Sequence, residues 1–333
     1  MPTTVLLTGI TGFIAKRIAF DLLRAGHAVV GTLRSPAREA EVRAAFDAGG
    51  LAGDALARLR FVALDLTADA GWAEATRGVD AVIHTASPFP LVQPKDQNAL
   101  IAPAVEGTLR VLRAAQASGA RRVILTSSME AVMHGQKSGP VTEADWTDLA
   151  APTVSAYTRS KTLAERAAWD FVGTRPEMQL TAINPGMVLG TPMDRHTGSS
   201  VGVIARILGG KDPVVPAIRL PVTDIADVSA AHLAALERPA SAGRRFIVAD
   251  RFVSMPDMAA LLKAAFPARR IATRIAPGLL LRALALFDPE IRLVLPWLGW
   301  TVSMDNTSVR RDLGVAITPA EQSILATARF LAA

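Results

Sequence analysis

Short apolar runs alternate with longer amphipathic stretches over the first 185 residues of the chain. The runs predict six strands, at residues 5–8, 28–33, 60–64, 81–84, 122–126 and 179–183. The stretches between them predict helices at residues 13–25, 36–48, 96–118 and 156–172. Strands and helices that alternate at this spacing are typical of a parallel sheet covered by helices on both faces. The pattern therefore predicts an α/β fold built on a doubly wound parallel sheet.

The pattern loosens after Pro185. Glycine and proline become frequent between residues 186 and 221, a helix is predicted at 224–237, and a strand at 245–248 could rejoin the sheet. From residue 251 the predicted elements are short and mixed, and a helix at 319–331 ends the chain. We therefore expect residues 1–190 with 222–250 to form the doubly wound domain. Residues 191–221 with 251–333 are expected to form a smaller mixed α/β lobe that binds the substrate.

The most apolar late stretch covers residues 275–300. Arg282, Asp288, Glu290 and Arg292 interrupt it, so it falls short of the apolar length that a membrane-spanning helix needs. We expect this stretch to line a hydrophobic pocket or to form the core of the second lobe, with an interfacial contact as the alternative.

Composition narrows the classes of function. The 333 residues include no cysteine, which excludes disulfides and thiolate metal ligands, and the five histidines show no metal-ligand spacing, so no metal site is predicted. A formal net charge of +6 fits either a solvated basic surface or attraction to a polyanionic ligand such as a dinucleotide phosphate. Dispersed basic residues and a single tyrosine argue against a nucleic-acid partner. The first residues lack the pattern of a signal peptide, so we expect a cytoplasmic protein with no membrane partner.

A glycine-rich loop follows the first predicted strand. Thr8 leads into Gly9-x-x-Gly12-x-x-Ala15, and a predicted helix begins within this segment. Glycines at this spacing permit a tight turn and a close approach of the backbone to a pyrophosphate, while the helix N-terminus supplies amide donors. In this strand–turn–helix context the loop predicts a dinucleotide site of the Rossmann type.

The end of the second predicted strand discriminates between NAD and NADP. An acidic residue there would accept hydrogen bonds from the ribose 2′-hydroxyl, but this chain has Arg34 and Arg38 and no acid between them. Arg34 could pair with a 2′-phosphate, and Arg38 could assist it. We therefore expect NADP(H) to be preferred, with NAD(H) possible as a cofactor. Asp65 and Leu66 follow the third strand and are placed to approach the adenine, although an Asp at this position is also a common helix cap.

Three residues in two segments carry the predicted chemistry. Ser128 follows the fifth strand, at the sheet edge where a hydroxyl can hydrogen-bond a substrate oxygen. Tyr157 and Lys161 are four residues apart in a predicted helix, so they share one face. A nearby ammonium favours the phenolate, and we expect it to lower the pKa of Tyr157 from its reference of about 10. Tyr157 would then be a usable proton donor near neutral pH.

The joint order of these motifs resembles the extended short-chain dehydrogenase/reductase family over nearly the whole chain. Within that family the chain is most similar to the branch of dihydroflavonol reductases, cinnamoyl-CoA reductases and yeast-type aldehyde/ketone reductases. The match to the family includes residues 184–186, and the segments that carry the resemblance to this branch are residues 84–89, 103–108, 126–128, 161–165, 305–307 and 313–314.

The resemblance implies a role for each matching residue. Tyr157 would be the general acid in reduction and the base in oxidation. Lys161 would bind the nicotinamide ribose and lower the pKa of the tyrosine, and Ser128 would orient and polarise the carbonyl. The implied reaction is the reversible, NADPH-dependent reduction of an aldehyde or ketone to an alcohol on a fairly apolar small molecule. The protein would act as a monomer or a homodimer.

The remaining predicted contacts form two sets. The cofactor set is Thr8, Gly9, Thr11, Gly12, Phe13, Ile14, Arg34, Arg38, Asp65, Leu66, Thr85, Ala86, Ser87, Tyr157, Lys161, Pro185, Gly186 and Val188. The substrate set is Phe89, Met129, Glu130, Met133, Met187 and Leu189. Plant reductases of this branch usually have smaller residues where this chain has Met129 and Glu130. A glutamate there could narrow the pocket, bind a polar substituent or point to solvent.

Three alternative functions remain open. A nucleotide-sugar epimerase or dehydratase shares the fold, but its relatives usually show an Arg-x-x-Asn pattern where this chain has Thr181 and Asn184. A hydroxysteroid dehydrogenase is compatible with an apolar second lobe. An NADPH-sensing regulator that is not an enzyme would commonly lack the tyrosine, so the presence of Ser128, Tyr157 and Lys161 argues against it.

Overall fold

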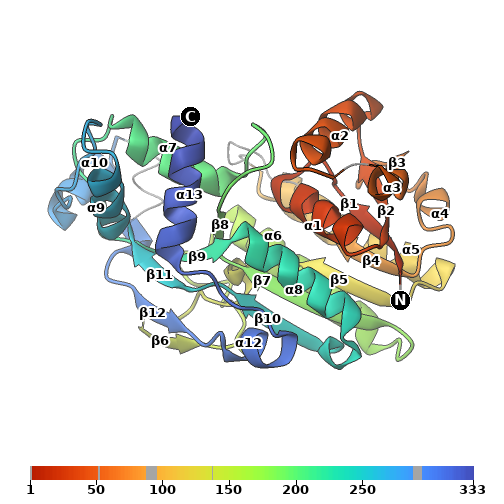
Figure 1. Ribbon diagram of the computed structural model, residues 1–333. Helices are drawn as coiled ribbons and strands as arrows, with labels where there is room; N and C mark the ends of the chain where they lie inside the picture. The colour runs from red at the N-terminus through yellow and green to blue at the C-terminus, as the bar shows by residue number, and fades with distance from the viewer. Residues whose placement is uncertain (1, 52, 88–95, 137, 288–294) are drawn as a thin grey trace.

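A seven-stranded sheet organises the molecule (Figure 1). The computed structural model describes residues 2–51, 53–87, 96–136, 138–287 and 295–333. The strands are β1 (Thr4–Thr8), β2 (Ala28–Leu33), β3 (Leu59–Ala63), β4 (Ala81–His84), β5 (Arg122–Thr126), β7 (Gln179–Pro185) and β10 (Arg244–Val248). They are all parallel and lie in the order β10-β7-β5-β4-β1-β2-β3. The predicted doubly wound sheet is confirmed, and β10 rejoins it beside β7.

Helices cover both faces of this sheet. Because side chains alternate along a strand, Val5 and Leu7 of β1 face one hydrophobic cluster and Leu6 faces the other. The first cluster draws on α1 (Phe13–Arg24), α2 (Glu39–Ala48), α8 (Ile225–Glu237) and α12 (Thr307–Leu313). The second draws on α4 (Trp72–Ala75), α5 (Asn98–Ser118) and α6 (Ala156–Gly173). Short helices η1 (Pro36–Arg38) and α3 (Asp54–Ala57) complete this part of the chain.

A smaller lobe is built on two minor sheets, at the left of Figure 1. In one sheet, β9 (Arg219–Asp224) pairs in parallel with β8 (Met187–Leu189) and antiparallel with β11 (Arg251–Ser254). In the other, β6 (Ser138–Val141) pairs in parallel with β12 (Thr301–Met304). The helices around them are η2 (Met129–Ala131), α7 (Ser199–Gly209), α9 (Met255–Ala265), α10 (Gly278–Leu284), η4 (Leu295–Trp297) and α13 (Ala320–Ala332). The short helix η3 (Pro239–Ser241) lies instead beside α8 and α12 of the large sheet.

The two parts interleave more than the expected boundaries suggest. β8 falls within the range predicted for the doubly wound domain, yet it belongs to a minor sheet. Conversely, Val309 and Leu313 of α12 fall within the predicted second lobe but are buried in the cluster that covers the large sheet. The boundaries stay a prediction, and these contacts show that the chain crosses between the two parts several times.

The apolar stretch near residue 275 does not form the core that its composition suggested. Among its described residues, Leu281 and Ala285 are buried, whereas Leu279 is 79% exposed and Phe287 is 87% exposed. The expectation of a buried pocket or core is therefore wrong for most large side chains of residues 275–287, because only one side of α10 packs against the lobe. In the part of the chain that the structure describes, no helix has both the length and the hydropathy to cross a membrane.

Candidate active site

The glycine loop forms a cradle between β1 and α1. Gly9 has φ +70°, and a Cβ atom there would lie 3.1 Å from the Cβ of Ala86, so glycine is required for the close approach of these two strand ends. The Gly12 amide donates to the Gly9 carbonyl at 2.9 Å, which closes the turn. None of the described side chains caps the first turn of α1 at Gly12. The loop therefore presents bare backbone at a helix N-terminus, which suits a phosphate group.

Thr8 joins the cradle to the wall formed by β4. Its Oγ1 accepts hydrogen bonds from the amides of Thr85 at 3.1 Å and Ala86 at 3.0 Å, and lies 2.8 Å from Nδ1 of His84. Burial lowers the pKa of His84 to about 3, with the charge of Lys161 adding to the effect, so the imidazole is neutral. Ala86 and Ser87 line a pocket beside this wall. The predicted cofactor residues Thr8, Thr85, Ala86 and Ser87 thus lie together at one sheet edge.

The residues predicted for the adenosine end lie at the ends of β2 and β3. Arg34 is exposed, whereas Arg38 is held by Glu41 through two hydrogen bonds of 2.9 Å. Asp65 accepts hydrogen bonds from the amide and hydroxyl of Thr67, which lower its pKa, and the charge of Arg34 lowers it further. The structure thus leaves the Arg34 side chain accessible for an anion, while Asp65 also caps a turn.

Leu66 fills a space that only glycine leaves open. A Cβ atom on Gly107 of α5 would lie 2.4 Å from Cγ of Leu66, so the absence of a side chain at Gly107 lets Leu66 pack against the helix. This contact gives Leu66 a packing role, and its predicted contact with the cofactor stays a prediction.

The segment after β7 returns to the cradle. Phe13 and Ile14 at the start of α1 pack against the small cluster that contains Val188 of β8, so these three predicted cofactor residues lie in one region. Thr11 lies partly buried in the same loop, and Pro185 is buried at the end of β7. Gly186 is placed so close to β9 that a Cβ atom would lie 2.4 Å from the carbonyl oxygen of Pro221.

Ser128, Tyr157 and Lys161 converge at the carboxyl edge of the sheet. Ser128 follows β5 and caps η2, where its Oγ accepts the Glu130 amide at 3.2 Å. A hydrogen bond also joins the hydroxyls of Ser128 and Tyr157. Lys161 is buried on α6, one turn after Tyr157, and its Nζ donates to the Thr126 carbonyl at 3.2 Å. The predicted catalytic residues therefore meet, although they come from separate segments.

The direction of the pKa shift of Tyr157 differs from the expectation. Burial, with the negative charge of Glu130 in support, raises the pKa of Tyr157 above its ordinary value, and the hydrogen bond with Ser128 offsets only part of this. Burial also lowers the pKa of Lys161 to about 8, against the opposing charge of Glu165. The expected lowering of the tyrosine pKa by the lysine is therefore wrong, because burial and the charge of Glu130 together outweigh the hydrogen bond with Ser128.

Glu130 turns toward α6 and away from bulk solvent. Its Oε2 accepts hydrogen bonds from Thr158 at 2.5 Å and from Nε2 of His134 at 2.9 Å. Burial alone would raise the pKa of Glu130, but the hydrogen bond and charge of His134, with the bond from Thr158, lower it. Because both partners of Oε2 lie within the protein, this oxygen does not point to solvent, while narrowing of the pocket and binding of a polar substituent stay predictions. The carboxylate is an internal acceptor that ties η2 to the start of α6.

Four residues of the predicted substrate set are buried in hydrophobic clusters. Met129 and Met133 pack with Val132 and Trp300, while Met187 and Leu189 belong to the cluster of the smaller lobe. All four are at most 9% exposed. Such packing argues against direct contact with a substrate. Phe89, the remaining member, lies outside the described residues.

Sequence patterns missed a buried polar group behind the catalytic residues. Glu165 of α6, Arg245 of β10 and Asn184 of β7 are hydrogen-bonded to one another or to the Ser128 segment. One sequence signal was available, because Glu165 follows Lys161 by four residues and must share its helix face. The contribution of Arg245 had no local signal.

A second charge cluster lies beside the cradle. Ligand atoms of Glu41, Asp194 and His196 lie within 4.8 Å of one another, a spacing that could hold a metal ion. The buried ammonium of Lys16 occupies the same place and pairs with both Glu41, at 2.7 Å, and Asp194. We therefore interpret the group as an ion-pair cluster. It links α1 and α2 to the segment that follows β8.

Comparisons with known proteins agree on one class. A sequence model of the NAD dependent epimerase/dehydratase family matches residues 5–249. Anthocyanidin reductase ((2S)-flavan-3-ol-forming) of Vitis vinifera is 30% identical over 287 residues, which cover 81% of this chain and 83% of that protein. Cinnamoyl-CoA reductase CAD2 of Medicago truncatula is 30% identical over 334 residues, covering 98% and 95%. The crystal structure of yeast methylglyoxal/isovaleraldehyde reductase Gre2 complexed with NADPH has a TM-score of 0.81 at 26% identity and covers 98% of both chains.

Proposed function

This chain belongs to the NAD dependent epimerase/dehydratase family, and from that premise we propose that it reduces an aldehyde or ketone to an alcohol with NADPH. The family and the named reductases make it an oxidoreductase, as the resemblance in sequence implied. The observation that carries the proposal is the meeting of Ser128, Tyr157 and Lys161 at the sheet edge next to the glycine cradle. The substrate we favour is a fairly apolar small molecule.

The cradle fits the cofactor that the Gre2 structure contains. Gly9 and Gly12 leave backbone exposed where a side chain would intrude, and the first turn of α1 has no side-chain cap among the described residues. Arg34 stands exposed at the end of β2, and residues 32–38, all of which the structure describes, contain no acid that could accept a hydrogen bond from a ribose 2′-hydroxyl. These residues suit the pyrophosphate and the 2′-phosphate of NADP(H), which we assign as the cofactor.

When bound, NADPH supplies the hydride. The protein residues would orient the carbonyl group and stabilise the negative charge that develops on its oxygen. Ser128 would donate a hydrogen bond to the substrate oxygen, and Tyr157 would donate its proton there as negative charge develops. Because the pKa of Tyr157 is raised, the phenol stays protonated at neutral pH, which is the form that reduction needs. Lys161 would hold the ribose of the cofactor and keep positive charge near the phenol.

The test is a panel of aldehydes and ketones with NADPH, followed by absorbance. Consumption of NADPH with apolar carbonyl compounds, and none with nucleotide sugars, is expected. Turnover of a nucleotide sugar without net change in the cofactor would overturn the proposal.

Tyr157→Phe should lower kcat by about 10²–10⁴-fold, the usual contribution of a positioned general acid. NADPH binding, measured by fluorescence, should persist, since the phenyl ring keeps its place in α6. Arg159→Gln is the control, because Arg159 is two residues away on the same helix and pairs with none of the catalytic side chains in the contacts described above. Wild-type turnover in Tyr157→Phe would refute the role assigned to the phenol.

A further inference from the structure

Glu165 is a buried carboxylate at the back of the catalytic residues. Its side chain is 0% exposed. Oε1 accepts hydrogen bonds from Nε of Arg245 at 2.6 Å and from the indole of Trp169 at 3.2 Å. Oε2 accepts from the Ser127 hydroxyl and from Nδ2 of Asn184 at 2.8 Å. A carboxylate removed from water is tolerated only with such partners, so this geometry is strongly specified.

Asn184 links the Glu165 carboxylate to the backbone of Ser128. Its Nδ2 group donates both to Glu165 and, at 3.0 Å, to the main-chain carbonyl of Ser128. Ser127, the neighbour of Ser128, donates to the same carboxylate. The position of the Ser128 backbone is therefore set by the place where Glu165 is held.

Arg245 fixes the other side of the carboxylate and reaches three further segments. Its Nη1 donates to the carbonyls of Glu143 at 3.0 Å and Asp145 at 2.6 Å, and its guanidinium stacks 3.9 Å from the ring of Trp146. Its Nη2 reaches the carbonyl of Ala131, in the η2 turn that begins after Ser128, at 3.5 Å. One guanidinium at the sheet edge thus joins η2, the loop after β6 and α6.

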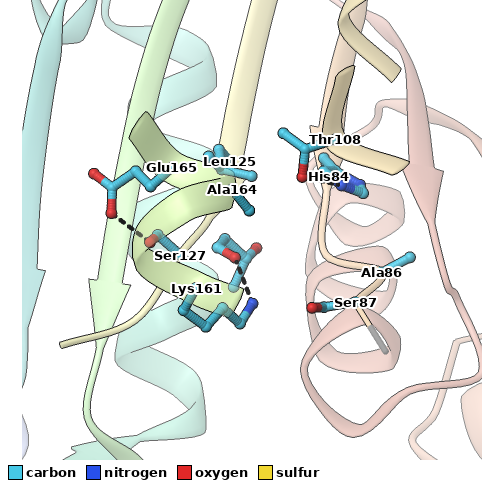
Figure 2. Close-up of a pocket in the computed structure, with 10 residues that line it drawn as sticks. His84, Ala86, Ser87, Thr108, Leu125, Ser127, Lys161, Ala164 and Glu165 are labelled. Atoms are coloured by element: carbon cyan, nitrogen blue, oxygen red, sulfur yellow. Dashed lines mark hydrogen bonds between the residues drawn. The ribbon is translucent and has the colours of Figure 1, made fainter. Parts of the chain in front are cut away.

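Glu165 also lies on the same helix as Tyr157 and Lys161. Figure 2 shows Lys161 and Glu165 projecting from α6 on one wall of the pocket, with His84 and Thr108 on the facing wall. Any shift of Glu165 would therefore move the proton donor and the serine relative to each other.

We propose that Glu165 and Arg245 are positioning residues, a buried ion pair that holds the Ser128 segment, through Asn184, in register with the helix that carries Tyr157 and Lys161. This inference rests on the proposed roles of those three residues. Neither member of the pair needs to touch the substrate, because the effect passes through the backbone of Ser128 and the axis of α6.

The decisive variant replaces the pair by apolar residues of similar size, Glu165→Leu with Arg245→Met. Removing both charges leaves neither one buried without a partner, so the fold is expected to survive. We expect kcat to fall about 10²-fold, the loss that a misplacement of about 1 Å can cause. NADPH affinity, read by fluorescence without turnover, should change by less than about threefold, because the cradle is formed by other elements. A folded double variant with wild-type kcat would overturn the inference.

A second variant avoids the ion pair altogether. Asn184→Ser shortens the link between Glu165 and the Ser128 carbonyl, and we expect a lower kcat with little change in KM for NADPH. Unchanged kcat here would also overturn the inference. The matched control is Asp312→Asn. Asp312 pairs at 2.6 Å with Arg244, which precedes Arg245 on β10 and points to the opposite face of the sheet. This variant should lower stability and leave kcat alone.

The pH profile supplies a readout that loss of stability would not move. Two titratable groups that face Lys161, Tyr157 and Glu165, lie on its own helix. A third, His84 from β4, is neutral. Arg245 lies behind Glu165. Since the charge of Glu165 supports protonation of Lys161, Glu165→Gln should move the alkaline limb of the kcat/KM profile to lower pH. An unmoved limb would contradict this part of the inference.

Failure of the inference and failure of the proposed function can be told apart. If Tyr157→Phe is inactive while the pair variants are fully active, only the positioning role fails. If Tyr157→Phe is active, the proposed function itself fails.

Discussion

Lys16 is the buried cation of the cluster with Glu41 and Asp194, and Lys16→Met would test what that cluster contributes to stability. Methionine keeps most of the apolar stem and removes the charge. The lysine side chain is 1% exposed, whereas those of Glu41 and Asp194 are 22% and 19% exposed. Breaking a buried ion pair costs about 3–5 kcal/mol. Because both carboxylates reach solvent and Glu41 keeps Arg38, we expect a loss of about 2–3 kcal/mol.

The same cluster makes stability depend on pH. Burial alone would raise the pKa of Glu41, but hydrogen bonds from Arg38 and Lys16, together with their charges, lower it from 4.5 to about 2. Such a shift corresponds to at most about 3 kcal/mol, and screening of the partly exposed carboxylate reduces this to about 1–2 kcal/mol. Since the folded-state pKa is the lower one, this stabilisation is present above the unfolded-state pKa. It is lost as the pH falls through the folded-state value.

Urea unfolding, followed by tryptophan fluorescence between about pH 7 and about pH 3.5, would measure both effects. The free energy of unfolding of Lys16→Met should lie below that of the wild type at neutral pH, and the gap should shrink as the pH falls. Arg206→Met, which removes an exposed pair with Asp212, should cost less than about 1 kcal/mol. A gap of constant size at every pH would refute the reasoning, because it would show that packing of the lysine stem, and not its charge, had been lost.

Three predictions concern the cofactor side of the molecule. Gly186→Ala should lower stability by about 1–3 kcal/mol in thermal unfolding, because the new Cβ would press on the carbonyl of Pro221. The control is Gly202→Ala, whose new Cβ would lie in open space and should not lower stability. Equal melting temperatures for the two variants would contradict the close approach at Gly186. Arg34→Asp should raise the dissociation constant of NADPH far more than that of NADH, and equal effects on the two would remove the 2′-phosphate assignment. With the pKa of Lys161 lowered to about 8, kcat/KM for NADPH should fall about tenfold per pH unit above that value, since the protonated lysine is the active form. A flat profile to about pH 10 would contradict that role.

The large sheet and the meeting of Ser128, Tyr157 and Lys161 at its edge were predictable from sequence because their signals are local. The apolar run before Gly9 and the spacing of Tyr157 and Lys161 each involve only a few neighbouring residues. The periodicity of hydrophobic residues then assigns the first to a strand and the second to a helix. The parallel sheet then brings Ser128 and Tyr157 to one edge without further information. The minor sheets gave no such signal, because their strands pair across distant parts of the chain.

Other features depend on tertiary contacts that no local pattern encodes. Arg245 meets Glu165 across 80 residues of sequence, and only the order of strands in the sheet makes them neighbours. The raised pKa of Tyr157 follows from burial and from Glu130, neither of which the spacing to Lys161 reveals. Leu279 and Phe287 were misjudged because apolar composition does not say which side chains a partner element covers.

The position of β10 at the end of the sheet has a consequence for the order of assembly. Strands β1 to β5 and the glycine cradle are encoded by the first 126 residues, so their contacts can form while the rest of the chain is still being made. Arg245 emerges more than a hundred residues later, and until it docks, the Glu165 carboxylate has no cation to pair with. Pairing of β10 with β7 closes the loop between Pro185 and Arg244, which costs conformational entropy. The strands and the loop that form the glycine cradle are therefore synthesised well before the cation that pairs with Glu165.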